Sequence, residues 1–436
     1  MNFIFLLLIL LLQIEFFSFT IIVLPFKKYT KYNSKKNYIE YLYKNDLFIN
    51  IEIGTPSQSI PLFLSFGDLP TYIIGKSLNG EYDPLISQTL KNISFKEEVY
   101  FFQKFHKGYI INETIEFKNI KNEKEKIKDI SLVLATSFNS GNEIKSVLGL
   151  SINGLTSFLN QNLIYELKTN SITESMIWTL IFNNENEGEI IIGNNPHNYN
   201  KSYKEEDLKQ VKAEKRLGTA IYWDFLFNKV YSNNKLIDDD VKGYLDIQFG
   251  LIKGSLNYKK FIEKNFLNET NLCKKNYAFN NSIEYYICDL KSNIKNFPKI
   301  IFEQMELKFN FELTYEDVFE KRDDKYYCKI VFEDKNNDKI FVLGQPFLKK
   351  YQIVFNADRK LMGIYINQKF NYFNLFLWFI IIILIIIISI LLILIYQKYI
   401  KKPRKVRANE LEEDFLYNIQ TDNNNQDYIK NSKINK

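Results

Sequence analysis

The hydrophobic and polar residues between positions 38 and 365 alternate in short segments rather than in long helical stretches. Runs rich in Ile, Phe, Tyr and Val are broken by clusters of Asn, Asp, Gly and Lys, which is typical of strands separated by turns. Long amphipathic helices are scarce, so this region is expected to be mainly β. The clearest predicted strands are residues 47–53, 60–64, 72–74, 130–134, 177–182, 189–192 and 339–343.

A short apolar segment opens the chain, with a nearly unbroken run over residues 3–12. That run is too short to cross a bilayer comfortably and stands where a signal sequence belongs. We therefore assign residues 1–20 to a cleaved signal peptide. Glu15 interrupts the segment and no basic residue precedes it, so an uncleaved anchor remains the alternative.

A second apolar segment, residues 375–396, carries no charge and is dominated by Ile and Leu. It matches the ~20 residues that a bilayer-spanning helix needs, and Trp378 and Tyr396 stand near its ends as interface anchors. A basic cluster follows at once, which by the positive-inside rule places residues 397–436 in the cytosol. We expect a single-pass type I membrane protein of the secretory or endolysosomal pathway or the cell surface, with its larger part lumenal or extracellular.

Composition narrows the possible chemistry. The formal net charge of +6 is concentrated in short runs such as residues 401–405, which favours a membrane flank over a nucleic-acid partner. The chain has only two histidines, His106 and His197, and three cysteines, and none stand at the paired spacings of zinc sites. We expect no metal site and no cofactor, and interpret both histidines as surface residues.

Five Asn-X-Ser/Thr sequons precede the second apolar segment and are candidate glycosylation sites, although an asparagine-rich chain contains many by chance. They are Asn92, Asn112, Asn200, Asn268 and Asn280.

Four further motifs occur in a fixed order. The segments at residues 48–58, 146–150, 188–193 and 341–351 read FINIEIGTPSQ, SVLGL, GEIIIG and FVLGQPFLKKY. Together they resemble the pepsin family of aspartic proteases (peptidase family A1). The resemblance implies a bilobal acid protease fold, in which two β-barrel-like lobes enclose a substrate cleft.

On this resemblance, the N-terminal lobe covers residues 37–215 and the C-terminal lobe covers residues 216–368. Residues 21–36 then form a short pro-like segment, because VLPFKK at residues 23–28 is similar to the start of the family's pro-region.

The resemblance also locates the two catalytic aspartates of the family, each in an Asp-Thr/Ser-Gly loop. In the first loop of this chain Ser65 replaces the aspartate and Phe66 replaces the threonine, while Gly67 is kept. The second loop keeps Asp246 but carries Ile247 where the family has threonine. Hydrolysis on this fold needs two carboxylates that share one proton, and a serine hydroxyl cannot hold that proton.

The remaining cleft residues are assigned by position. Phe101 stands where the family's flap has a tyrosine, and Gly67, Asp68 and Tyr72 belong to the cleft near the first loop. Asp68 is better explained as a solvated turn residue than as a substitute acid, because catalytic groups must be held within fractions of an ångström.

By the same resemblance Cys288 and Cys328 form the disulfide of the second lobe, as suits an oxidising lumen. Cys273 is then either free or a competitor for Cys288.

Three functions remain open. The favoured one is a catalytically impaired, membrane-anchored family member, monomeric, whose cleft binds a peptide or protein ligand without cutting it. The alternatives are an active aspartic endopeptidase with atypical loops and a surface glycoprotein that uses the fold as a rigid module.

Overall fold

The computed structural model of the chain describes most of the residues between positions 19 and 396. The described residues are 19–29, 38–67, 70–92, 99–101, 106–138, 145–152, 162–217, 220–267, 273–333, 339–366, 372–396, 411–412 and 415. They divide into two compact units, residues 1–368 and residues 369–436. Most of the predicted signal peptide, Asp68 and Asn268 lie outside the described residues.

The first unit is built almost entirely of strands, as the alternating pattern predicts. The strands of the N-terminal half are β1 (Ile22–Lys28), β2 (Leu47–Ile53), β3 (Gln58–Ser65), β4 (Tyr72–Ile74), β5 (Lys91–Asn92), β6 (Val99–Phe101), β7 (His106–Asn119), β8 (Lys124–Phe138), β9 (Val147–Gly149), β10 (Ile177–Phe182) and β11 (Glu187–Ile192). Buried and exposed positions alternate along β2, whose Ile49, Ile51 and Ile53 face the core. Gly54 has a φ of +85° in the turn to β3, a conformation that favours glycine.

The C-terminal half supplies a second set of strands. They are β12 (Leu208–Lys212), β13 (Lys215–Leu217), β14 (Ala220–Ile221), β15 (Asp224–Ser232), β16 (Lys235–Leu245), β17 (Ile252–Lys253), β18 (Cys273–Ala278), β19 (Ile283–Asp289), β20 (Ile300–Gln304), β21 (Phe309–Leu313), β22 (Phe319–Arg322), β23 (Lys325–Cys328), β24 (Ile330–Glu333), β25 (Ile340–Leu343), β26 (Val354–Asn356) and β27 (Leu361–Tyr365).

Helices in the first unit are short. They are α2 (Tyr38–Tyr43), α3 (Leu163–Thr169), α4 (Leu256–Ile262), α6 (Tyr315–Val318) and α7 (Gln345–Lys350), with single turns η1 (Lys76–Leu78), η3 (Pro196–Asn198), η4 (Glu205–Asp207), η5 (Glu263–Leu267) and η6 (Ile294–Asn296). The start of α4 is fixed by Ser255, whose Oγ accepts a hydrogen bond from the Tyr258 amide at 3.1 Å.

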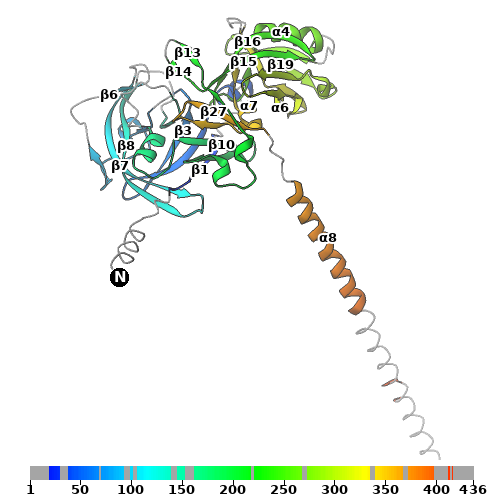
Figure 1. The fold of residues 1–436 in the computed structure, drawn as a ribbon, viewed down its shortest axis with the longest axis horizontal. Coiled ribbons are helices and arrows are strands. Elements are labelled where there is room, and N and C mark those ends of the chain that lie inside the picture. Colours follow the sequence, from blue (N-terminus) through cyan, green and yellow to red (C-terminus); the bar gives the residue numbers. More distant parts are fainter. Residues whose placement is uncertain are drawn as a thin grey trace, which may run out of the picture. The chain divides into compact units, whose positions relative to one another are not determined.

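The two halves share one sheet. Its first strands follow the order β12-β27-β26-β10-β11-β1, so strands from the two halves of the chain meet where β10 pairs with β26. Figure 1 shows β27 beside β10 at this junction. Trp178 of β10 and Phe355 of β26 stack there with ring centroids 4.0 Å apart, and both are buried. The fold is therefore bilobal and mainly β, with a shared sheet that joins the lobes.

Residues 22–28, which the sequence places in a pro-like segment, form strand β1 of the shared sheet. This strand pairs with β11 from Ile22 opposite Ile192 to Lys27 opposite Glu187, and also with β2. Its buried side chains, Ile22, Leu24 and Phe26, belong to the main core.

The disulfide differs from the expected one. Cys273 is bonded to Cys288, whereas Cys328 is free and buried, so the predicted pairing of Cys288 with Cys328 is wrong. The reason is strand register: β18 and β19 form an antiparallel hairpin that places Cys273 directly opposite Cys288. Tyr326 is the residue opposite Cys288 on its other neighbour, β23, which leaves Cys328 two positions away.

The second unit contains one long helix, α8 (Tyr372–Ile395). Its side chains are described from Ile383 onward, and those that are large and apolar are exposed. Among the described residues, no helix qualifies as long and apolar enough to cross a membrane.

Candidate functional site

The loop that carries Ser65 is held by a three-strand motif in the N-terminal lobe. Strand β3 runs parallel to β9 and places Ser65 opposite Gly149, while β4 pairs with the other side of β9 through Tyr72 and Val147. Ser65 ends β3 with 2% of its surface exposed. Its Oγ accepts a hydrogen bond from the Gly67 amide at 3.2 Å.

The C-terminal lobe repeats this motif around Asp246. Strand β16 runs parallel to β25 and pairs Leu245 with Leu343, so the next residue, Asp246, falls beside Gly344. Strand β17 pairs antiparallel with β25 through Lys253. Asp246 Oδ1 accepts a hydrogen bond from the Gln248 amide at 2.9 Å.

The two motifs can be matched residue by residue. When Val147 is matched with Val342, the strand pairings match Ser65 with Asp246 and Tyr72 with Lys253. The side chains of Ser65 and Asp246 each accept a hydrogen bond from the backbone amide two residues later, so they are held in the same way. Ser65 and Asp246 therefore occupy equivalent positions in the two lobes, and they differ in chemistry: one is a hydroxyl, the other a carboxylate.

The residues after Ser65 and Asp246 are apolar and buried. Phe66 packs against Trp178 and Phe355, with ring centroids 5.7 Å and 5.3 Å away. Phe355 belongs to the last third of the chain, so the first loop reaches the junction of the lobes. Ile247 is fully buried in the same core. Packing of apolar side chains thus holds both loops at these positions.

An open cavity of about 360 Å³ lies beside Asp246 and is lined also by Tyr43, Lys44 and Asp46. Tyr43 donates a hydrogen bond from its hydroxyl to Glu333 at 3.1 Å. Burial, and then the Glu333 carboxylate, raises the pKa of Tyr43 to about 12, so this phenol is neutral at physiological pH. Of the predicted cleft residues in the described part of the chain, Asp246 alone lines this cavity.

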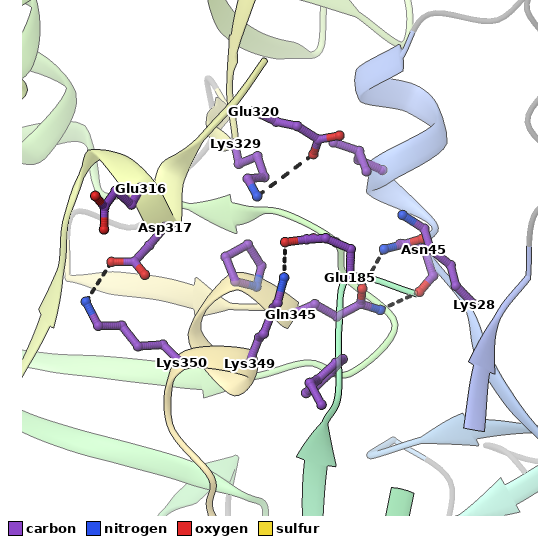
Figure 2. A pocket seen from close by; sticks show the side chains of 14 residues that line it. Lys28, Asn45, Glu185, Glu316, Asp317, Glu320, Lys329, Gln345, Lys349 and Lys350 are labelled. Carbon is purple, nitrogen blue, oxygen red and sulfur yellow. Dashed lines mark hydrogen bonds and ion pairs between the residues drawn. The ribbon is translucent and has the colours of Figure 1, made fainter. Parts of the chain in front are cut away.

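The buried side-chain amides of Asn45, in the N-terminal lobe, and Gln345, in the C-terminal lobe, form a hydrogen-bonded pair (Figure 2). We call these two residues the amide pair. Gln345 accepts a hydrogen bond from Asn45 Nδ2 at 2.5 Å and donates from Nε2 to the Asn45 carbonyl at 2.5 Å. The same Nε2 donates to the Ile247 carbonyl at 2.8 Å, immediately after Asp246. The backbone N–H of Asn45 donates to the Gln248 carbonyl at 2.9 Å.

Sequence reasoning did not identify this amide pair or the neighbours of Asp246, Tyr43 and Lys253. One signal was present for Gln345, because it follows Gly344 in the motif FVLGQPFLKKY and corresponds to Leu150 after Gly149. The polar Gln345 and the apolar Leu150 therefore occupy corresponding positions, and only the Asp246 loop receives a side-chain hydrogen bond from this position among the described residues.

The other predicted residues lie at separate places. Phe101 ends β6 at the expected hairpin with β7, and its side chain is outside the described part, as is that of Asn92. Asn200 and Asn280 are exposed in turns, whereas Asn112 is half-buried in the middle of β7. His197 is half-buried and hydrogen-bonds through Nδ1 with the Tyr365 hydroxyl at 2.8 Å, which corrects its interpretation as a plain surface residue.

Among the described residues, no cluster of three or more His, Cys, Asp or Glu side chains could hold a metal ion.

Comparisons with known proteins agree with this arrangement. The sequence profile of the eukaryotic aspartyl protease family matches residues 46–365. Among solved structures, basic 7S globulin from soybean is similar with a TM-score of 0.60 and 11% identity, over 80% of this chain and 96% of that one. No curated protein matches the sequence of the chain. The profile match covers most of the chain, including both motifs around Ser65 and Asp246, and the chain therefore belongs to the eukaryotic aspartyl protease family.

Proposed function

We propose that this protein is a membrane-anchored member of the family that binds a peptide or protein segment between its lobes without hydrolysing it. The observation that carries the proposal is the correspondence of Ser65 with Asp246. Both positions receive the same backbone hydrogen bond, and only Asp246 is an acid.

Peptide hydrolysis in this fold requires a base that takes a proton from water and an acid that protonates the substrate carbonyl. Two carboxylates that share one proton perform both roles, because like charges at such short distance cannot both ionise. Ser65 can hydrogen-bond a water but cannot remove its proton at physiological or acidic pH. Loss of a positioned acid or base costs roughly 10²- to 10⁴-fold in rate.

The direct experiment measures binding and cleavage of the same peptides by the full-length chain. A library of fluorogenic peptides is incubated between pH 3 and pH 7, and binding is followed by fluorescence polarisation. The proposal expects saturable binding without turnover. Turnover that is abolished in Asp246→Asn would instead show an active aspartic endopeptidase, and the absence of both binding and turnover would favour a rigid surface module.

Membrane anchoring through residues 375–396 is part of the proposal. It is supported by the absence of charge in this segment, by helix α8 over nearly the same positions, and by the exposed apolar side chains from Ile383 to Ile395. We propose type I topology, with glycans on exposed sequons such as Asn200 and Asn280. Extraction with alkaline carbonate tests the anchor: the full-length chain should stay with the membrane pellet, and a chain ending at residue 370 should not.

A further inference from the structure

A second cavity, of about 240 Å³, is lined by residues of both lobes (Figure 2). Its walls include the apolar residues Leu42, Phe182 and Pro346, together with Asn45 and Gln345 of the amide pair. Its charged residues come from both lobes. They are Lys28, Glu185, Glu316, Asp317, Glu320, Lys329, Lys349 and Lys350.

Most of these charges neutralise one another. Lys349 forms an ion pair with Glu185, and Lys350 donates to Asp317 at 2.7 Å. The Lys329 ammonium lies 3.9 Å from Glu320, beyond hydrogen-bond distance, and Glu320 also accepts a hydrogen bond from the Tyr38 hydroxyl.

The remaining acidic residue, Glu316, is exposed and accepts a hydrogen bond from the Tyr315 hydroxyl at 2.9 Å. Lys28 differs from the other three lysines that line the cavity, because it forms no ion pair with any described residue. Its ammonium lies 5.1 Å from the centre of the Tyr41 ring.

Three of the lysines are therefore held in an unfavourable environment. Burial lowers the pKa of Lys28, Lys329 and Lys349 from the usual lysine value. The Glu320 carboxylate opposes this effect by raising the pKa of Lys28 and Lys329, whereas repulsion lowers the pKa of Lys28 through Lys329 and that of Lys349 through Lys28. Lys329 is only 8% exposed. Buried cations are normally paired. The four lysines and four carboxylates that line the cavity balance in number, but Lys28 is the one of these lysines that forms no ion pair within the described part of the chain.

We propose that this cavity is a binding site for a small oxyanion, a carboxylate or a phosphate, held by Lys28, Lys329 and Lys349. Three ammonium groups, from β1, the β23–β24 connection and α7, line this cavity. A phosphate has enough oxygens to accept a charge-assisted hydrogen bond from each of them, whereas a carboxylate can offer a separate oxygen to two. The apolar wall formed by Leu42, Phe182 and Pro346 leaves space for a short aliphatic portion. The site does not depend on whether the cleft binds or cuts peptides.

The position of the cavity connects it to the Asp246 loop. Gly250, at the end of that loop, lines the cavity, and its amide donates to the Leu42 carbonyl at 2.9 Å. Gln345 lines the cavity as well and donates to the Ile247 carbonyl. An anion bound here therefore stiffens the segment that carries Asp246.

Isothermal titration calorimetry of the full-length chain tests the site with sodium phosphate and sodium acetate, against sodium chloride at equal ionic strength. One of the two oxyanions should bind saturably, and the stronger one identifies the ligand chemistry. Lys28→Met should weaken that binding at least about tenfold. The matched control is Lys27→Met, which removes an exposed charge from the adjacent position of β1 and should leave the affinity within about twofold.

A second variant keeps the test decisive if Lys28→Met folds poorly. Glu185→Gln removes the exposed carboxylate that competes for Lys349, so the affinity should rise by about two- to fivefold. Absence of oxyanion binding at millimolar concentrations would overturn the proposal. Equal affinities for the wild-type chain, Lys28→Met and Glu185→Gln would also overturn it, because the anion would then bind elsewhere.

Discussion

The Ser65 loop and the Asp246 loop have the same backbone plan and different chemistry. In each lobe, the strand that leads into the loop runs parallel to a second strand, with a glycine, Gly149 or Gly344, beside Ser65 or Asp246. The backbone amide two residues after Ser65 or Asp246 donates a hydrogen bond to its side chain. The backbone plan is maintained by strand pairing and apolar packing, neither of which needs a carboxylate. The comparison teaches that the fold of this family and its hydrolytic chemistry are separable, because they depend on different atoms.

The largest effect is expected from a carboxylate introduced at position 65, which would remove the chemical difference between the two loops. Ser65→Asp supplies a second carboxylate at a position already held by the Gly67 amide, so acid-dependent peptide cleavage should rise by about 10²-fold or more. The measurement is turnover of a fluorogenic peptide library between pH 3 and pH 6.

Ser65→Asn is the control, since it has similar size but cannot ionise, and it should remain inactive. The double variant Ser65→Asp with Asp246→Asn should lose the gained activity. If Ser65→Asp folds normally and still shows no cleavage, the loss of chemistry extends beyond this position.

A methyl group added at Gly344, beside the Asp246 loop, and at Gly67, in the Ser65 loop, tests how tightly the two places are packed. A Cβ on Gly344 would lie 2.0 Å from the Phe249 carbonyl oxygen and 2.3 Å from that of Leu251, so the backbone must shift. Gly344→Ala should lower the free energy of unfolding by about 1–3 kcal/mol or more, measured by urea denaturation.

Gly67, two residues after Ser65 in the first loop, serves as the comparison, because the nearest atom to an added Cβ there is Ser65 Oγ at 3.7 Å. Gly67→Ala should therefore change the stability by less than about 0.5 kcal/mol. Equal losses for the two variants would contradict the close packing assigned to Gly344.

The amide pair can be removed so that the second loop resembles the first. Gln345→Leu introduces the residue type that Leu150 has at the corresponding position, and it leaves the Ile247 and Asn45 carbonyls without their buried donor. We expect a loss of about 1–3 kcal/mol in the free energy of unfolding. Gln210→Leu, on a half-buried position of β12, serves as the control and should change the stability by less than about 0.5 kcal/mol.

The smallest expected effect concerns Tyr43 beside Asp246. Burial raises the pKa of Tyr43 to about 12 in the folded chain, whereas a tyrosine in the unfolded chain titrates near 10. The unfolded chain therefore releases this proton first, so stability falls as pH rises from about 10 to 12. Tyr43→Phe should make that decline shallower in urea titrations across this range, and Tyr277→Phe at an exposed position should leave it unchanged.

Much of the local structure was predictable from the sequence, because it depends on neighbouring residues. The pattern of apolar residues predicted strands at residues 47–53, 72–74 and 177–182, and strands β2, β4 and β10 have the same bounds. The family motifs also placed Ser65 and Asp246 in their loops, and the strand pairings give these two residues equivalent positions in the two lobes.

The remaining features depend on contacts between distant residues. Asn45 and Gln345 are 300 positions apart, and no local pattern indicates that they meet. The disulfide was mispredicted because the register of the β18–β19 hairpin decides which cysteine faces Cys288. Likewise, the cluster formed by Lys28, Lys329 and Lys349 exists only after β1 joins the shared sheet.

The pairing of β10 with β26 has a consequence for synthesis of the protein on the ribosome. Strand β10 ends at Phe182 and its partner begins at Val354, so the edge of β10 stays unpaired until nearly the whole first unit has been translated. At ordinary elongation rates this interval lasts about ten to thirty seconds. An exposed strand edge attracts other chains, so the nascent N-terminal half should need chaperone cover for that time.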